Sequence, residues 1–86
     1  MVKVHIPQLF RQQAGGATTV EATGTTLREI VADLVRQFPA LENRVIDDAG
    51  IRPEILLAVG ADEAFDANQA VAPGSEVFIL PAIAGG

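Results

Sequence analysis

The sequence predicts an α+β domain in which one main helix packs on one face of a sheet. Three observations lead to this fold class. Residues 2–6 alternate between apolar and polar side chains, residues 27–38 carry apolar side chains at helical spacing, and residues 54–59 and 75–81 are apolar at consecutive positions. With 86 residues, of which 49% are apolar, we expect a single domain over residues 1–86.

The first two predicted strands form a hairpin. Residues 2–6 read as a half-buried strand, and His5 falls on its polar side, so we expect His5 to face solvent. Pro7 ends the strand because it has no N–H to donate. The Gly-Gly pair at positions 15 and 16 suits a turn, and residues 18–22 supply the second strand. A phosphate-binding loop is excluded here, since neither a helix start nor the required lysine follows the glycines.

The helix is the clearest predicted element. Thr26 and Glu29 match a capping box at its start, and Pro39 ends it. Its apolar residues recur at the spacing of one helical face: Leu27, Ile30, Val31, Leu34, Val35 and Phe38. An aliphatic stripe at this spacing indicates a core face and not a binding groove.

The second half of the chain supplies the remaining strands. We expect residues 40–53 to form a connection with one short helical turn around residues 41–46, and residues 54–59 to form the third strand. Residues 60–74 are rich in turn-forming residues and hold at most short edge pieces near Phe65 and Val71. The last strand covers residues 75–81.

The last strand predicts an exposed apolar patch. Successive side chains of a strand point to opposite faces, so if Val77 and Ile79 face the helix, Phe78 and Leu80 face away from it. Leu56 is placed with them by the same argument. One helix covers only one face, and an uncovered apolar patch usually marks a docking surface for another protein. The alternatives are that residues 60–74 cover the patch or that the chain self-associates.

Composition narrows the chemistry. The absence of cysteine excludes disulfides, a thiolate nucleophile and thiolate metal sites, and a single histidine cannot build a multi-histidine site, so we expect no metal. The net charge of −5 lies entirely in residues 44–86. The negative charge disfavours binding of nucleic acid. It fits a cationic protein partner, in which case Glu76 and Asp62 would form the rim of the docking surface on this chain. The alternative is that these charges are ordinary solvated surface. No segment predicts a membrane span or a secretory signal, so we expect a cytoplasmic protein with no membrane partner.

The ending "PGSEVFILPAIAGG" resembles the signature of the ubiquitin-like sulfur carriers of the MoaD/ThiS family. Gly74 precedes the acidic Glu76, an apolar strand follows, and the chain closes on Pro-x-x-Ala-Gly-Gly. The opening "VKVHIPQLFRQQAGG" is also similar to the family's opening. The resemblance implies the β-grasp (ubiquitin-like) fold, with a mixed sheet. The chain departs from the family at Gly60, where members often carry Asn, and its ending is closer to the cysteine-pathway carriers than to the molybdopterin subunit.

The resemblance also implies a function for the tail. In such carriers an adenylating enzyme of the ubiquitin-activating type uses ATP to activate the carboxylate of the last glycine, here Gly86, which then becomes a thiocarboxylate. A sulfur-accepting synthase takes the sulfur; this is the molybdopterin synthase large subunit, a cysteine synthase or a thiazole synthase. The carrier is then a protein cosubstrate without a cofactor of its own, and not an enzyme.

The tail residues suit that role. Gly85 and Gly86 lack a Cβ atom and can enter a narrow channel, while Pro81 stiffens the base of the tail. We expect the partners to contact Phe78, Leu80, Leu56, Pro81 and Ile83. Two alternatives are a ubiquitin-like modifier that is conjugated to lysine amines through Gly86, and a β-grasp interaction module without terminal chemistry.

Overall fold

The N-terminal hairpin forms as predicted in the computed structural model, which describes residues 1–82. Strand β1 (Val2–His5) pairs antiparallel with β2 (Thr19–Ala22), with Val4 opposite Val20. Between them lies a four-residue helix, α1 (Gln8–Arg11), which buries Phe10 and was not predicted because it is too short to show a helical period. Gly15 and Gly16 both take positive φ, at 66° and 84°, in the turn that follows.

The predicted helix is α2 (Leu27–Gln37), and its capping differs from the predicted capping box in one detail. The Thr26 hydroxyl accepts the Glu29 N–H at 3.2 Å, as expected of an N-cap. The Glu29 carboxylate instead accepts the N–H of Thr25, at 2.7 Å, one residue before the cap. Hydrogen bonds from the Thr25 backbone and hydroxyl lower the pKa of Glu29. Helix α2 ends before Phe38, and a 3₁₀ turn, η1 (Pro39–Leu41), follows it.

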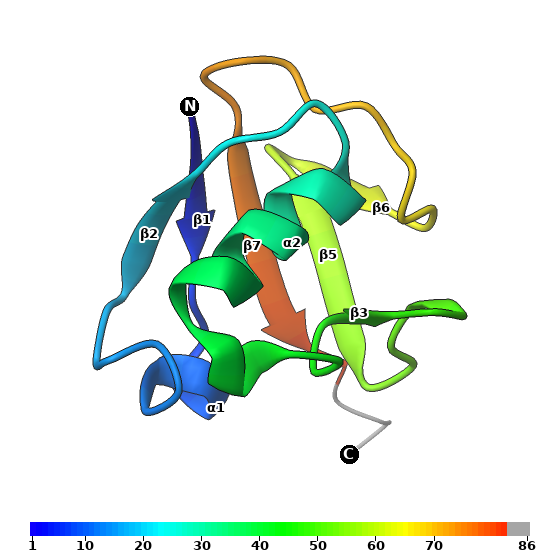
Figure 1. Cartoon of the computed structure of the whole chain (residues 1–86). Helices are drawn as coiled ribbons and strands as arrows, with labels where there is room; N and C mark the ends of the chain where they lie inside the picture. The colour runs from blue at the N-terminus through cyan, green and yellow to red at the C-terminus, as the bar shows by residue number, and fades with distance from the viewer. Residues whose placement is uncertain (83–86) are drawn as a thin grey trace.

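The sheet is mixed, and α2 crosses one face of it (Figure 1). Its strand order is β2-β1-β7-β5-β6. The central strand β7 (Glu76–Pro81) runs parallel to β1 and antiparallel to β5 (Ile55–Val59), while β6 (Asp62–Ala64) forms an edge. This arrangement confirms the predicted fold class of a mixed sheet with one main helix on one face.

The core lies between α2 and the sheet, and the predicted side-chain directions are correct. Val77, Ile79 and Leu57 are at most 2% exposed. From the helix, Leu27, Ile30, Val31 and Leu34 are buried, and Val35 and Phe38 pack against them partly buried. The faces of β5 and β7 that carry Leu56, Phe78 and Leu80 therefore point away from the helix.

The connection after α2 differs from the prediction. A helical turn was expected around residues 41–46, but the 3₁₀ turn η1 lies earlier and ends at Leu41. A small hairpin of β3 (Ile46–Asp47) and β4 (Gly50–Ile51) begins at the other end of that stretch. Leu41 and Val45 are fully buried and anchor this segment to the core. Strands of two residues are too short for a period-2 pattern, so the sequence could not reveal them.

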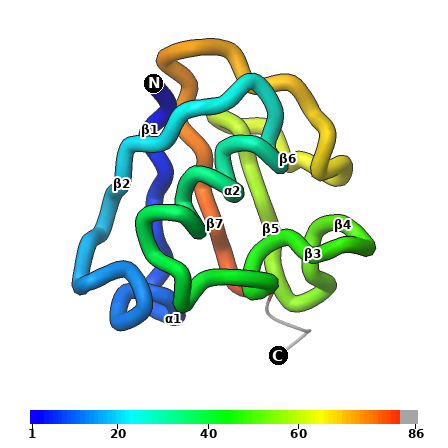
Figure 2. Tube along the Cα trace, viewed as in Figure 1, coloured from blue at the N-terminus to red at the C-terminus, as the bar shows by residue number. Residues whose placement is uncertain are grey.

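Residues 65–75 pack beside the start of α2 and leave the outer sheet face free. The first N–H groups of a helix have no acceptors within the helix, and carbonyl groups of this segment act as their acceptors. The Leu27 N–H donates to the Gln69 carbonyl at 3.0 Å, and the Arg28 N–H donates to the Ala67 carbonyl at 2.8 Å. The expected edge pieces near Phe65 and Val71 are β6 and a single bridge between Thr26 and Ala70. Figure 2 shows this segment curving past the start of α2 on the helix side of the sheet.

Candidate functional site: the outer sheet face and the base of the tail

Three of the predicted docking residues meet on the outer face of the sheet. Leu80 on β7 stands directly opposite Leu56 on β5, and Phe78 stands opposite Ala58 in the next row. Leu80 is 45% exposed, whereas Phe78 and Leu56 are half-buried. We call Leu56, Ala58, Phe78 and Leu80 the outer patch. Ala58 was not predicted, although the alternation along β5 places it on the same face.

The outer patch lies where the chain leaves the sheet. Pro81, also predicted as a contact residue, is exposed at the end of β7 and stands opposite Ile55. The Ala82 N–H donates to the Glu54 carbonyl at 2.8 Å, which fixes the base of the tail to the start of β5. The other predicted tail residues, Ile83, Gly85 and Gly86, lie outside the described residues.

The expectation for His5 is correct in its side of the sheet but not in its contacts. The imidazole lies on the outer face and is 33% exposed, but it stacks on the Phe78 ring and places Nε2 2.5 Å from a Glu76 carboxylate oxygen. The hydrogen bond from His5 lowers the pKa of Glu76. The contact depends on the parallel register of β1 and β7, which sets His5 beside Phe78 and which no local pattern in the sequence reveals.

Carboxylates border the outer patch, but not all of those predicted. Glu63 stands opposite Ala58, and Glu21 lies in line with Lys3 and Glu76 at the far end of the same face. Asp62 stands opposite Val59, which packs against the core, so Glu63 and not Asp62 borders the patch. The face is therefore apolar at the end where β7 leaves the sheet and charged at its other end.

An ion-pair network holds the segment next to the tail. Arg52 donates to Asp47 at 2.9 Å and to Glu54 at 3.1 Å, and Glu54 supplies the carbonyl that receives Ala82. The hydrogen bond from Arg52 is the main cause that lowers the pKa of Asp47. The pKa of Glu54 is lowered first by its own backbone N–H and then by Arg52.

This network predicts a pH-dependent stability difference for Arg52→Gln. A carboxyl group whose pKa is lowered by folding stabilises the fold above its unfolded pKa, and that contribution is lost as the pH falls through the folded value. We therefore expect wild type to exceed Arg52→Gln in unfolding free energy at pH 7 and the gap to narrow at pH 3, as measured by urea unfolding. The exposed Arg44→Gln is the control. An equal gap at both pH values would contradict the assignment.

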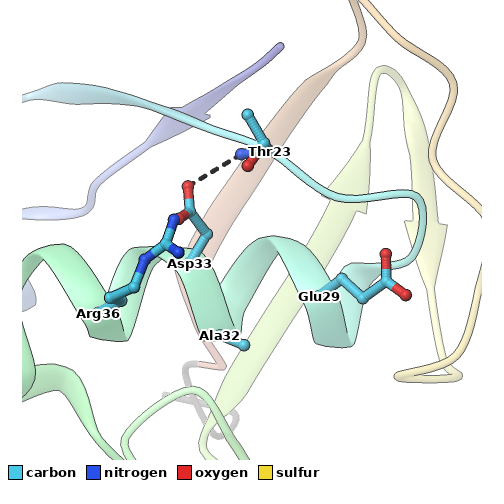
Figure 3. Close-up of a pocket in the computed structure, with 5 residues that line it drawn as sticks. All are labelled: Thr23, Glu29, Ala32, Asp33 and Arg36. Carbon is cyan, nitrogen blue, oxygen red and sulfur yellow. Dashed lines mark hydrogen bonds and ion pairs between the residues drawn. The ribbon is translucent and has the colours of Figure 1, made fainter.

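A groove on the helix side of the sheet contains Asp33, whose hydrogen bonds stabilise the fold. It has a volume of about 310 Å³ and is lined by Thr23, Glu29, Ala32, Asp33 and Arg36 (Figure 3). Asp33 is only 9% exposed, and its carboxylate accepts the Thr23 N–H at 3.0 Å and also bonds Arg36 and Gln37. The bond from Thr23 ties α2 to the end of β2, whereas Arg36 and Gln37 belong to α2 itself. Asp33 does not stand out in the sequence, because a charged residue on the polar side of a helix normally faces solvent.

The described residues contain neither a metal-binding cluster nor a membrane-spanning helix. Within residues 1–82, no cluster of three or more histidine, aspartate or glutamate side chains is placed to bind a metal ion. No helix in this part of the chain is long and apolar enough to span a membrane.

Comparison with known proteins agrees with this architecture. Residues 4–86 match the model of the ThiS family. The chain is 32% identical to "Sulfur carrier protein CysO" of Mycobacterium tuberculosis, over 99% of this chain and 98% of that protein. It also superposes with a TM-score of 0.91 on a chain from the crystal structure of the Amycolatopsis orientalis BexX/CysO complex, at 30% identity and with full coverage of both chains. Small archaeal modifier protein 1 from Haloferax volcanii is similar with a TM-score of 0.77, at 28% identity over 99% of this chain and 98% of that one.

The mixed sheet, the one main helix on one of its faces and the apolar outer patch at the end of β7 define a ubiquitin-like protein of the β-grasp class. The chain belongs to the ThiS family.

Proposed function

We propose that this chain is a sulfur carrier protein that bears sulfur as a thiocarboxylate on Gly86 and acts as a protein cosubstrate, not as an enzyme. The observation that carries the proposal is the similarity to CysO over 99% of the chain, which includes the segment that ends in Gly-Gly. The geometry of β7 supports it, since this one strand carries Phe78 and Leu80 of the outer patch and leads directly into the tail.

The chemistry needs only the main chain of the carrier. A carboxylate oxygen of Gly86 attacks the α-phosphorus of ATP, pyrophosphate leaves, and an acyl-adenylate forms. Hydrosulfide then attacks the acyl carbon and forms the C–S bond, the bond to the AMP oxygen breaks, and AMP leaves, so that one carboxylate oxygen has been replaced by sulfur with no change of oxidation state. The partner enzyme binds the ATP and supplies the acid–base groups, so the carrier needs no cofactor of its own. Both steps take place in the cytoplasm under this proposal.

The partners are an adenylating enzyme of the ubiquitin-activating type and a sulfur-accepting synthase. The similarity to CysO favours a cysteine-pathway acceptor over the molybdopterin synthase large subunit or a thiazole synthase. Both partners must receive the tail, and the outer patch lies at its base. Glu63 and Glu21 on the same face suit a partner whose contact surface is basic around an apolar centre.

A second candidate is a ubiquitin-like modifier. The likeness to small archaeal modifier protein 1 favours it. The modifier would use the same Gly86 adenylate, but a lysine amine would displace AMP and form an amide bond. The two functions therefore share the activation step and differ in the group that attacks the acyl carbon.

Reconstitution with the adenylating enzyme of the same organism tests the proposal. We expect exchange of labelled pyrophosphate into ATP to depend on the carrier, and added sulfide donor to convert Gly86 to a thiocarboxylate. Conjugates to lysine without any thiocarboxylate would favour the modifier. If the chain supports no exchange of pyrophosphate into ATP, the remaining explanation is a β-grasp interaction module without terminal chemistry.

Phe78→Ala should weaken docking of the adenylating enzyme while leaving the chain folded. Buried aromatic anchors dominate many interfaces, so we expect a loss of about 2 kcal/mol or more in binding free energy. The loss of unfolding free energy should stay small, because Phe78 lies outside the helix-facing core. Calorimetric titration and thermal unfolding measure the two effects.

Phe65→Ala is the matched control, since Phe65 is 81% exposed and lies outside the outer patch. This variant should bind as wild type does. Unchanged docking of Phe78→Ala would remove the outer patch from the proposal.

A further inference from the structure

The His5–Phe78 pair is a feature of the outer face that the proposed function leaves unexplained. The ring centroids lie 4.2 Å apart and the ring planes differ by 8°, so the imidazole stacks on the phenyl ring. The two residues stand side by side in the parallel register of β1 and β7. His5 therefore covers one side of the best candidate for a docking anchor.

His5 is itself held in place by the strand that carries Phe78. Its Nε2 atom lies 2.5 Å from a carboxylate oxygen of Glu76, two residues before Phe78 on β7. The carboxylate is an acceptor only, so Nε2 carries the proton and donates it to this bond. A flat ring that is fixed at one edge offers Phe78 a support with a defined orientation.

The opposite side of Phe78 has no comparable support in the sheet. Its neighbour on β5 is Ala58, whose methyl group is too small to cover a phenyl ring. Thr19, the neighbour of His5 on β2, lies one strand further away. The orientation of the Phe78 ring on the outer face thus depends on His5 more than on any other neighbour in its row.

We propose that His5 is a positioning residue that holds the Phe78 ring ready for docking of the adenylating enzyme. The proposal rests on the proposed function, which makes that enzyme the occupant of the outer patch. Glu63, which stands opposite Ala58 of the outer patch, favours an occupant that carries a basic residue next to its apolar contact surface. Docking onto a side chain that is already ordered avoids an entropy cost that corresponds to roughly two- to tenfold in affinity.

Two substitutions separate the stacked ring from the hydrogen bond. His5→Ala removes both, and His5→Phe keeps a flat ring but loses the bond to Glu76. Three-bond NMR couplings report the χ1 rotamers of Phe78 in the isolated chain, and adenylation kinetics report KM and kcat for the carrier. Thr19→Ala is the control, because it changes the same row of the face without touching Phe78.

We expect one Phe78 rotamer in wild type, in Thr19→Ala and in His5→Phe, and averaged rotamers in His5→Ala. The KM of His5→Ala should rise roughly two- to tenfold at constant kcat, and His5→Phe should restore it. A single rotamer and an unchanged KM in His5→Ala would overturn the proposal, as would equal losses in both variants. If wild type is not adenylated at all, the proposed function fails, whereas the rotamers still decide whether His5 positions Phe78.

Discussion

Deletion of Gly86 should abolish adenylation and thiocarboxylate formation while the fold stays intact. The truncated chain still ends in a carboxylate, but that group is one residue closer to the sheet, a displacement of about 3.5 Å along an extended chain. A misplacement of 1 Å at a reacting group can cost about a hundredfold in rate, so a shift of this size should remove activity altogether. Intact-mass measurement after reconstitution detects the thiocarboxylate.

The fold provides the control for this deletion. The described core lies within residues 2–79, and the last hydrogen bond of the described tail is made by Ala82. The truncated chain should therefore unfold at the same temperature as wild type. Normal thiocarboxylate formation by the truncated chain would end the proposal that Gly86 carries the chemistry.

Ile30→Ala should have the largest effect on stability. The Ile30 side chain is 0% exposed in the middle of α2, where it faces the sheet. Truncation of a buried isoleucine to alanine typically costs about 2–5 kcal/mol, through lost burial and the cavity that remains. Small domains are stable by only about 5–15 kcal/mol, so a cost at the upper end of the range for this truncation removes a large part of the unfolding free energy.

Urea unfolding measures this cost, and Leu9→Ala is the control. Leu9 is 55% exposed on α1, so its truncation should change the unfolding free energy by less than about 0.5 kcal/mol. A loss below about 1 kcal/mol for Ile30→Ala would mean that the helix buries a different face.

The features that local patterns encode could be predicted from the sequence. The 3.6-residue period predicts the buried face of α2, including Ile30 and Leu34, and strand alternation alone predicts that Phe78 and Leu80 share the outer face. The sulfur-carrier resemblance came from the ending, which is also a local motif. These features can be predicted because each depends only on the residues within one helix, one strand or one short motif.

The features that depend on contacts between distant segments could not be predicted. His5 looks solvent-exposed within its strand, and only the pairing of β1 with β7 brings it onto Phe78. Asp33 looks like an ordinary surface residue of α2, and only the approach of Thr23 gives its carboxylate a backbone N–H to accept. In both cases a polar side chain is partly shielded from solvent by a partner on another segment of the chain.

The intact mass of the protein purified from its native host tests the central claim most directly. The account predicts a fraction of molecules heavier by the difference between one sulfur and one oxygen atom, with the change located in the C-terminal fragment that contains Gly86. Iodoacetamide should alkylate that fraction, since the chain has no cysteine to react in its place. A protein that carries only a carboxylate at Gly86, or that is found only as amide conjugates to lysine, in cells that are actively transferring sulfur would contradict the account.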